Sequence, residues 1–98
     1  DKSLLGLAGL WDTWENDGEI MESCTIVTTT ANSFMEPIHE RMPVILMDED
    51  HLDWLDASNE DPKHLIKQFP SEKMQSWAVP SKVGNPRNNL PELIEPVA

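Results

Sequence analysis

The chain has 98 residues, with 18 acidic and 7 basic side chains and a formal net charge of −11 at pH 7. This length is enough for one small domain, and its core must be thin. The negative charge argues against a general affinity for nucleic acids, because proteins that bind them need cations to replace the counterions of the phosphates. No stretch approaches 18 apolar residues, so neither a membrane-spanning helix nor a membrane partner is expected.

The single cysteine, Cys24, cannot form a disulfide within the chain, which suits a reducing compartment and predicts a cytoplasmic protein. It has no histidine near it in sequence, so we expect a small core residue and not a nucleophile. His39, His51 and His64 do not pair with each other or with Cys24 at the spacing of metal ligands. We therefore predict no metal site and no cofactor, and we expect His51 and His64 to be exposed helix residues.

A hairpin is predicted at the start of the chain. Residues 4–14 alternate loosely between apolar and polar side chains, and residues 25–30, "TIVTTT", are six β-branched residues in a row, which favour a strand. Between them, Asp17 and Gly18 tolerate the positive φ of a tight turn. The leading run "LLGLAGLW" resembles a strand with no partner before it, so we expect a fragment of a longer protein that can self-associate through this apolar edge.

Short helical and extended segments alternate in the middle of the chain. Asn32 can cap a helical turn that Pro37 ends, because proline disfavours helix at the residue before it. "PVILM", residues 43–47, has the composition of a buried strand. Asp48 then resembles the N-cap of a helix over residues 49–56.

The predicted helix over residues 49–56 should bury Leu52 and Leu55, and Met47 is placed to form a hydrophobic staple with Leu52. A second helix is expected after Asp61, its cap, with Pro62 at its first position. This helix should end before Pro70 and bury the apolar side chains of Leu65, Ile66 and Phe69.

The last third of the chain carries weaker signals. Residues 73–79, "KMQSWAV", favour a further strand, and the proline-rich residues 80–98 are expected to run as an extended tail across the surface. The four tryptophans could stack on bases, but in a thin β-rich core they more often serve packing. These patterns alone indicate part of an acidic, β-rich α+β domain.

One short stretch raises a functional question. In "IHERMP", residues 38–43, a histidine, an acid and an arginine stand just before the predicted buried strand. A lone histidine at such a place is more often a hydrogen-bonded structural residue than a catalyst. The spacing of these residues does not decide between the two.

Three blocks, "LAGLWDTW", "SCTIVTTTAN" and "IHERMPVIL", and the tail "VGNPRNNLPELIEP" follow one another along the chain. In this order and at these gaps they resemble the SRAP family, the SOS response-associated peptidase domains, which include abasic-site sensor proteins. The resemblance covers nearly the whole chain. It implies an α+β, β-rich fold with a mixed, barrel-like antiparallel sheet and short helices. It also implies that residues 1–98 are the C-terminal half of a single, longer SRAP domain.

In the family, the nucleophile is a cysteine that becomes the N-terminal residue. It forms a stable thiazolidine ring with the aldehyde of an abasic site in single-stranded DNA, and it is thought to remove its own propeptide where one exists. An asparagine and a glutamate complete that site, and all three are expected upstream of the blocks present here. The resemblance therefore implies single-stranded DNA with abasic sites as the partner of the intact protein, and an inactive fragment.

Three residues of this chain match site positions of the family. His39 matches its active-site histidine, and an imidazole moves protons near neutral pH, which opening a sugar ring to its aldehyde and forming an imine require. Thr28, eleven residues earlier, matches a threonine that resembles a DNA-phosphate contact. Arg41 matches the motif arginine, which could anchor a phosphate or pair with a buried acid.

Two hypotheses remain at this point. The first is an SRAP-type protein that senses abasic sites through a covalent DNA–protein crosslink in the DNA damage response, with His39 catalytic and Thr28 and Arg41 binding DNA. The second is a non-catalytic acidic module that binds a basic protein partner. Sequence upstream of this segment would discriminate them, since only the first needs the N-terminal cysteine.

Overall fold

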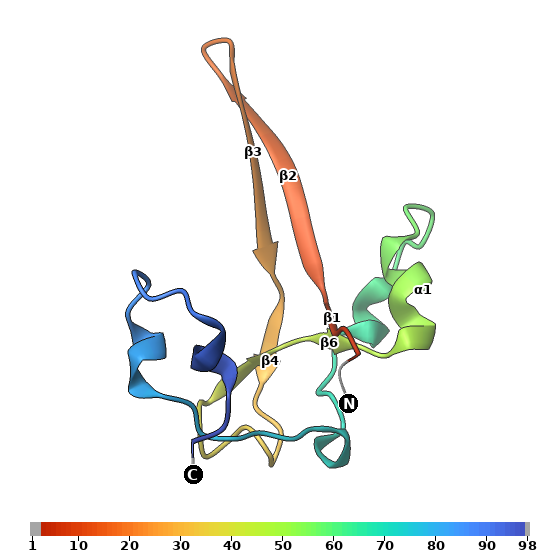
Figure 1. Ribbon diagram of the computed structural model, residues 1–98. Coiled ribbons are helices and arrows are strands. Elements are labelled where there is room, and N and C mark those ends of the chain that lie inside the picture. Colours follow the sequence, from red (N-terminus) through yellow and green to blue (C-terminus); the bar gives the residue numbers. More distant parts are fainter. Residues whose placement is uncertain (1–2, 98) are drawn as a thin grey trace.

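Three antiparallel two-stranded ladders organise the fold (Figure 1). The computed structural model describes residues 3–97. Its strands are β1 (Gly6–Leu7), β2 (Gly9–Asn16), β3 (Glu19–Ile26), β4 (Thr28–Thr30), β5 (Arg41–Pro43) and β6 (Ile45–Leu46). β2 pairs with β3, β4 with β5, and β1 with β6. With only short helices beside these ladders, the β-rich α+β prediction is confirmed.

The three ladders meet at one junction of backbone hydrogen bonds. Ala8, Val27 and Val44 each lie between two consecutive strands, and each donates one backbone bond and accepts one. The Ala8 N–H donates to Val44 O at 2.8 Å, the Val44 N–H to Val27 O at 2.9 Å, and the Val27 N–H to Ala8 O at 2.9 Å. This closed cycle is where the predicted strands 4–14, 25–30 and 43–47 are each interrupted.

The core is small and lies around this junction. Ala8 and Val44 are fully buried and pack with Leu46 and Leu65, with Val27 and Trp54 against them. Burial of the "PVILM" run is confirmed for its three central residues, since Val44, Ile45 and Leu46 are all buried. A thin core follows from the chain length, because a short chain has little interior relative to its surface.

The hairpin β2–β3 projects from this core (Figure 1). Asp17 and Gly18 form its turn with φ of 52° and 82°, as predicted, and Asn16 pairs with Glu19 across it. Every residue of both strands is exposed. The predictions that Cys24 is a core residue and that the tryptophans serve packing are therefore wrong for Cys24, Trp11 and Trp14, because no element among residues 3–97 covers either face of the hairpin.

The segment between β4 and β5 is a series of turns and not a helix. Asn32 does act as its cap: its Oδ1 accepts the Met35 N–H at 2.9 Å, and its backbone oxygen accepts the Glu36 N–H at 2.9 Å. Pro37 lacks the N–H that would continue such bonding, so the helical geometry does not extend.

After β6 the chain forms the 3₁₀ helix η1 (Asp48–Asp50) and the short helix α1 (His51–Leu55). The prediction that Asp48 caps this helix is wrong, because Met47 holds the cap position and no side chain bonds there. The predicted burial of Leu52 and Leu55 is also wrong, since they are 81% and 76% exposed. Their spacing predicted one buried face for both leucines, but no element among residues 3–97 covers that face.

The remaining elements are single 3₁₀ turns: η2 (Pro62–Leu65), η3 (Ser71–Lys73), η4 (Ser81–Gly84) and η5 (Pro91–Ile94). Asp61 caps η2, as predicted, by accepting the Lys63 N–H at 3.4 Å. Of the predicted buried residues, Leu65 is 2% exposed but Ile66 is 40% exposed. The expected second helix is thus reduced to one turn.

The predicted strand over residues 73–79 is wrong, because this segment joins no ladder among residues 3–97. It is instead partnered by the tail. The Trp77 Nε1–H donates to Ile94 O at 2.9 Å, and the Val97 N–H donates to Ala78 O at 2.9 Å. The tail therefore folds back on this segment through η4 and η5 and is not extended throughout (Figure 1).

Candidate functional site

The outer face of the β4–β5 ladder carries two of the three candidate residues. Thr30 lies opposite Arg41 in the register, and Thr28 lies two residues along the same strand. Side chains two apart on a strand share a face, so Thr28, Thr30 and Arg41 point the same way. Met42, on the other face, is 2% exposed, so this ladder has one buried and one solvent-facing side.

Arg41 and Thr28 are joined by a hydrogen bond between side chains. The Arg41 Nη2–H donates to Thr28 Oγ1 at 2.9 Å. The pair is diagonal across the ladder, a separation that a long side chain can span. Both residues are exposed, so the rest of the guanidinium and the Thr28 hydroxyl hydrogen face solvent.

The ring of His39 contacts the same site by a hydrogen bond from the backbone of Arg41. Its Nδ1 accepts the backbone N–H of Arg41 at 2.9 Å. A backbone N–H can only donate, so Nδ1 carries no proton and the neutral ring is protonated at Nε2. The ring is exposed, which leaves Nε2 accessible to a ligand as a proton donor.

The structure thus brings His39, Arg41 and Thr28 into one connected cluster, which we call the H-R-T site. The alternative that Arg41 pairs with a buried acid is not observed among residues 3–97, where its guanidinium donates to Thr28. One imidazole N–H donor beside a guanidinium and a hydroxyl can bind an anion and donate a hydrogen bond to an oxygen next to it.

Sequence reasoning missed Gln68, which lies next to this face. Its side-chain amide donates to Thr30 O and Thr30 Oγ1 at 3.1 Å and to Ala31 O at 3.2 Å. Gln68 comes from the segment after η2, 38 residues beyond Thr30. Nothing in the local sequence signals this contact, because it depends on a long-range approach of two irregular segments.

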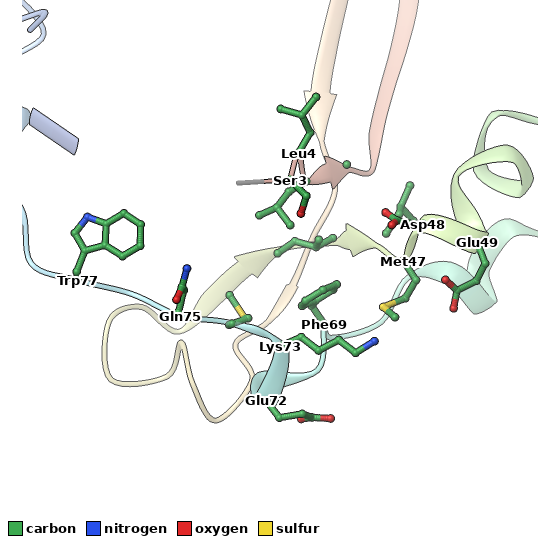
Figure 2. A pocket seen from close by; sticks show the side chains of 15 residues that line it. Ser3, Leu4, Met47, Asp48, Glu49, Phe69, Glu72, Lys73, Gln75 and Trp77 are labelled. Atoms are coloured by element: carbon green, nitrogen blue, oxygen red, sulfur yellow. The ribbon is translucent and has the colours of Figure 1, made fainter. Parts of the chain in front are cut away.

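A groove lies on a different part of the molecule (Figure 2). It runs between the β1–β6 ladder and the segment around η3, and Leu4, Met47, Phe69 and Trp77 are among its lining side chains. Lys73 adds one cation, opposed by acidic side chains of the η1 region. None of the three H-R-T residues lines this groove, so the candidate site is a surface cluster and not the concavity.

The described residues were also compared with the ligand sets that hold metal ions. Among residues 3–97, no three His, Cys, Asp or Glu side chains gather closely enough to hold an ion.

The other two histidines differ in exposure. His64 is exposed, as predicted, whereas His51 is half-buried. The His51 ring lies against Gly6 of β1, with Nε2 3.4 Å from Leu46 O, so it packs a helix onto a ladder. Among the helices of residues 3–97, none is long and apolar enough to cross a membrane.

Comparison with known protein families shows which family the chain belongs to. The family model of the SOS response associated peptidase (SRAP) matches residues 1–86. The chain belongs to the SRAP family. This match includes all three residues of the H-R-T site and the junction of the three ladders.

Relatives of the chain bear names that refer to abasic sites. The chain is 43% identical to the abasic site processing protein YoqW of Bacillus subtilis, with 95% of this chain and 43% of that protein aligned. It is 39% identical to the abasic site processing protein HMCES of Pongo abelii, with 96% of this chain and 28% of that protein aligned. The chain therefore spans less than half the length of these relatives.

Solved SRAP-like structures share the fold. A crystal structure of a protein from Bacteroides thetaiotaomicron aligns with a TM-score of 0.83 at 28% identity, over 96% of this chain and 44% of that one. One from Bordetella bronchiseptica aligns with a TM-score of 0.61 at 36% identity, over 69% of this chain and 36% of that one. The arrangement of three short ladders is thus found within longer chains.

Proposed function

We propose that this chain supplies the H-R-T site of an SRAP protein that processes abasic sites in single-stranded DNA. The observation that carries the proposal is the hydrogen-bonded cluster of His39, Arg41 and Thr28 on one exposed face. The names of the relatives, YoqW and HMCES, support the substrate class. A guanidinium and a hydroxyl side by side suit a DNA phosphate, since both donate hydrogen bonds and the first adds charge.

In the proposed mechanism His39 acts on the sugar of the abasic site. Ring opening moves a proton to the ring oxygen as the aldehyde forms, and imine formation removes the carbonyl oxygen as water. With Nδ1 bound to the Arg41 N–H, the neutral His39 ring donates a hydrogen bond from Nε2 to the oxygen in either step. Full proton transfer from His39 needs the imidazolium, in which Nδ1 has taken a proton and released the Arg41 N–H; giving one proton to the oxygen returns the ring to its neutral form. The nucleophile is the N-terminal cysteine of the complete domain, whose amine and thiol form the crosslink. Peptidase-like removal of a propeptide is proposed for the same cysteine.

We propose further that residues 1–98 form the C-terminal half of a single SRAP domain. Their accessible surface is 8331 Å², whereas a folded monomer of this mass exposes about 5,700 Å². The excess is about 2,600 Å² on this chain alone, whereas permanent interfaces bury on the order of 2,000–5,000 Å² summed over both partners, so it is enough for one side of such an interface. Large apolar side chains are more than half exposed, among them Leu4, Trp11, Ile20, Leu52, Leu55 and Ile94.

The acidic interaction module remains a second candidate. Its support is the projecting hairpin, where Asp12, Glu15, Asp17, Glu19 and Glu22 are exposed and no lysine or arginine is present. A basic surface would complement this charge. The two candidates differ in partner, a basic protein against single-stranded DNA, and in whether the H-R-T site does chemistry.

The test is covalent capture by a complete SRAP domain that carries this segment. His39→Ala should slow capture of an abasic oligonucleotide at saturating DNA by about a hundredfold or more, with near-normal affinity. Thr28→Val should instead weaken binding by about 0.5–1.5 kcal/mol, as the loss of one ordinary hydrogen bond does, and leave the saturated rate near normal. The crosslinking rate against DNA concentration separates the two effects.

Circular dichroism must show that each variant is folded. A folded His39→Ala domain that captures abasic sites at the wild-type rate would exclude a catalytic role for His39. It would then favour the structural interpretation of this histidine and the interaction module.

A further inference from the structure

His39 is reached through a loop that has little regular structure of its own. The loop runs from the end of β4 to the start of β5, over residues 31–40, and its two ends are joined by the Ala31 N–H donating to Glu40 O at 3.0 Å. Within it, Met35 O accepts both the Ile38 N–H at 2.8 Å and the His39 N–H at 3.0 Å. The position of His39 therefore depends on where Met35 is held.

Asn32 holds Met35. Its Oδ1 accepts the Met35 N–H at 2.9 Å, and its Nδ2 donates to Phe69 O at 2.6 Å. Asn32 is 5% exposed, and it is the one polar residue among those buried in residues 3–97. A buried amide needs partners for both of its ends, and here one partner is the loop and the other is a segment 37 residues away.

Two further side chains of that distant segment bind the loop. Ser71 Oγ lies 3.0 Å from Ser33 Oγ and accepts the Phe34 N–H at 3.3 Å. Gln68 donates to Thr30 and Ala31, at the point where the loop leaves β4. We call Gln68, Ser71 and the Phe69 carbonyl the 68–71 brace.

We propose that Asn32 and the 68–71 brace are positioning residues for the H-R-T site, fixing the loop so that the His39 ring meets the Arg41 N–H. The inference rests on the proposed role of His39, but the placement it describes is independent of DNA. A loop closed only by its two ends would sample many conformations, and the bond from Arg41 N to His39 Nδ1 would then be intermittent. Holding a proton donor in one orientation is what a catalytic imidazole needs.

Hydrogen exchange at the Arg41 amide measures this placement in the chain itself. Arg41 lies on an exposed ladder, and its N–H is protected by His39 Nδ1. Gln68→Glu removes the donors of the brace and places a carboxylate against carbonyl oxygens. It should raise Arg41 exchange by about tenfold or more through local opening, without changing exchange at Val44 in the ladder junction. Ser71→Ala should act in the same direction with a smaller effect.

Gln75→Glu is the matched control, since it makes the same chemical change at an exposed position outside the brace and should leave Arg41 exchange unchanged. Asn32→Asp keeps the Met35 acceptor but loses the Phe69 donor, and it should resemble Gln68→Glu. Asn32 is buried, so should that variant fail to fold, the variants at exposed Gln68 and half-buried Ser71 decide. Unchanged Arg41 exchange in folded Gln68→Glu and Ser71→Ala would overturn the proposal.

The second measurement separates positioning from general stability. In the complete domain, Gln68→Glu should lower the capture rate at saturating DNA on the order of tenfold to a hundredfold and leave DNA affinity near normal. Weaker binding at an unchanged saturated rate would overturn the positioning role. Faster Arg41 exchange with no change in capture at all would uphold the brace and overturn the proposed function of His39.

Discussion

At Asp56 the fold changes the acidity of one side chain. Its Oδ1 accepts the Ser58 hydroxyl at 2.6 Å and the Ser58 N–H at 2.9 Å. These two bonds, the side-chain one first, lower the pKa of Asp56 below its usual value of 3.8, against a small opposing effect of desolvation. Both bonds favour the charged carboxylate.

Ser58→Ala should therefore raise the pKa of Asp56 toward 3.8. A carboxyl whose folded pKa is lowered contributes stability above its unfolded pKa, and this contribution is lost as the pH falls through the folded pKa. The variant should thus be less stable than wild type above pH 3.8, and the difference should shrink below pH 3.8 and disappear once the pH is below the lowered folded pKa of Asp56. Carboxyl carbon chemical shifts against pH would measure the change. Ser81→Ala, at an exposed serine far along the chain, should leave the Asp56 titration as it is.

Contacts between elements can be tested at Gly6. A Cβ on Gly6 would lie 2.7 Å from His51 Nε2, closer than atoms approach. Gly6→Ala should push the His51 ring out of its contact with Leu46 O and loosen α1 from the β1–β6 ladder. Because the atoms in the way belong to the end of a side chain that can turn aside, we expect a loss at the low end of overpacked sites, about 1 kcal/mol in the free energy of unfolding. Urea unfolding measures it.

Gly84→Ala is the control for this substitution. A Cβ on Gly84 would meet no atom within 4 Å, so the added methyl changes only the freedom of the backbone. Such a change is neutral or slightly stabilising where the native φ suits alanine. Equal stability losses at Gly6 and Gly84 would show that the packing of His51 on Gly6 is not what matters.

Local signals in the sequence were sufficient for some elements and not for others. The Asp17-Gly18 turn and the β-branched strand were predicted because the backbone preference resides in those residues. The breaks at Ala8, Val27 and Val44 were not predicted, since they arise from bonds between distant strands. The exposure of Leu52 was also missed, because periodicity identifies an apolar face but not what covers it.

The candidate site divides in the same way. The family resemblance of "HERMP" and of the threonine-rich block led to His39, Thr28 and Arg41, and the structure places them together. The backbone donor to His39 Nδ1 and the amide of Gln68 had no signature in the sequence. Both depend on the shape of the loop over residues 31–40, which no local pattern specifies.

The whole molecule is elongated for its size. Its radius of gyration is 17.0 Å, compared with about 13 Å for a compact chain of this length, and the β2–β3 hairpin accounts for much of the difference (Figure 1). Within residues 3–97, β1 pairs with β6 on one side only, and Leu4 and Leu5 beside it are 92% and 64% exposed. The isolated chain should therefore self-associate, because an open strand edge beside apolar side chains is a template for pairing.

Sedimentation velocity at micromolar concentration would detect these oligomers. Leu5→Lys should shift the chain toward monomer, because a lysine beside an edge strand opposes pairing. Asn85→Lys adds the same charge at an exposed position away from the edge and should leave the distribution unchanged. A wild-type chain that sediments as a monomer and binds no hydrophobic dye would count against the incomplete-domain proposal.

The cycle formed by Ala8, Val27 and Val44 has a consequence for how the chain folds. Because each of these residues is donor to one neighbour and acceptor from the other, the cycle cannot be completed until three distant parts of the chain have met. Its sequence separations make it a late, high-contact-order event, which is intrinsically slow. Val27→Ala, which trims a side chain packed on the core, should then accelerate unfolding more than it slows refolding in a stopped-flow chevron. The hairpin forms its turn locally and early, so the three backbone bonds of the cycle are expected to close after the main barrier to folding and to hold the folded chain against unfolding.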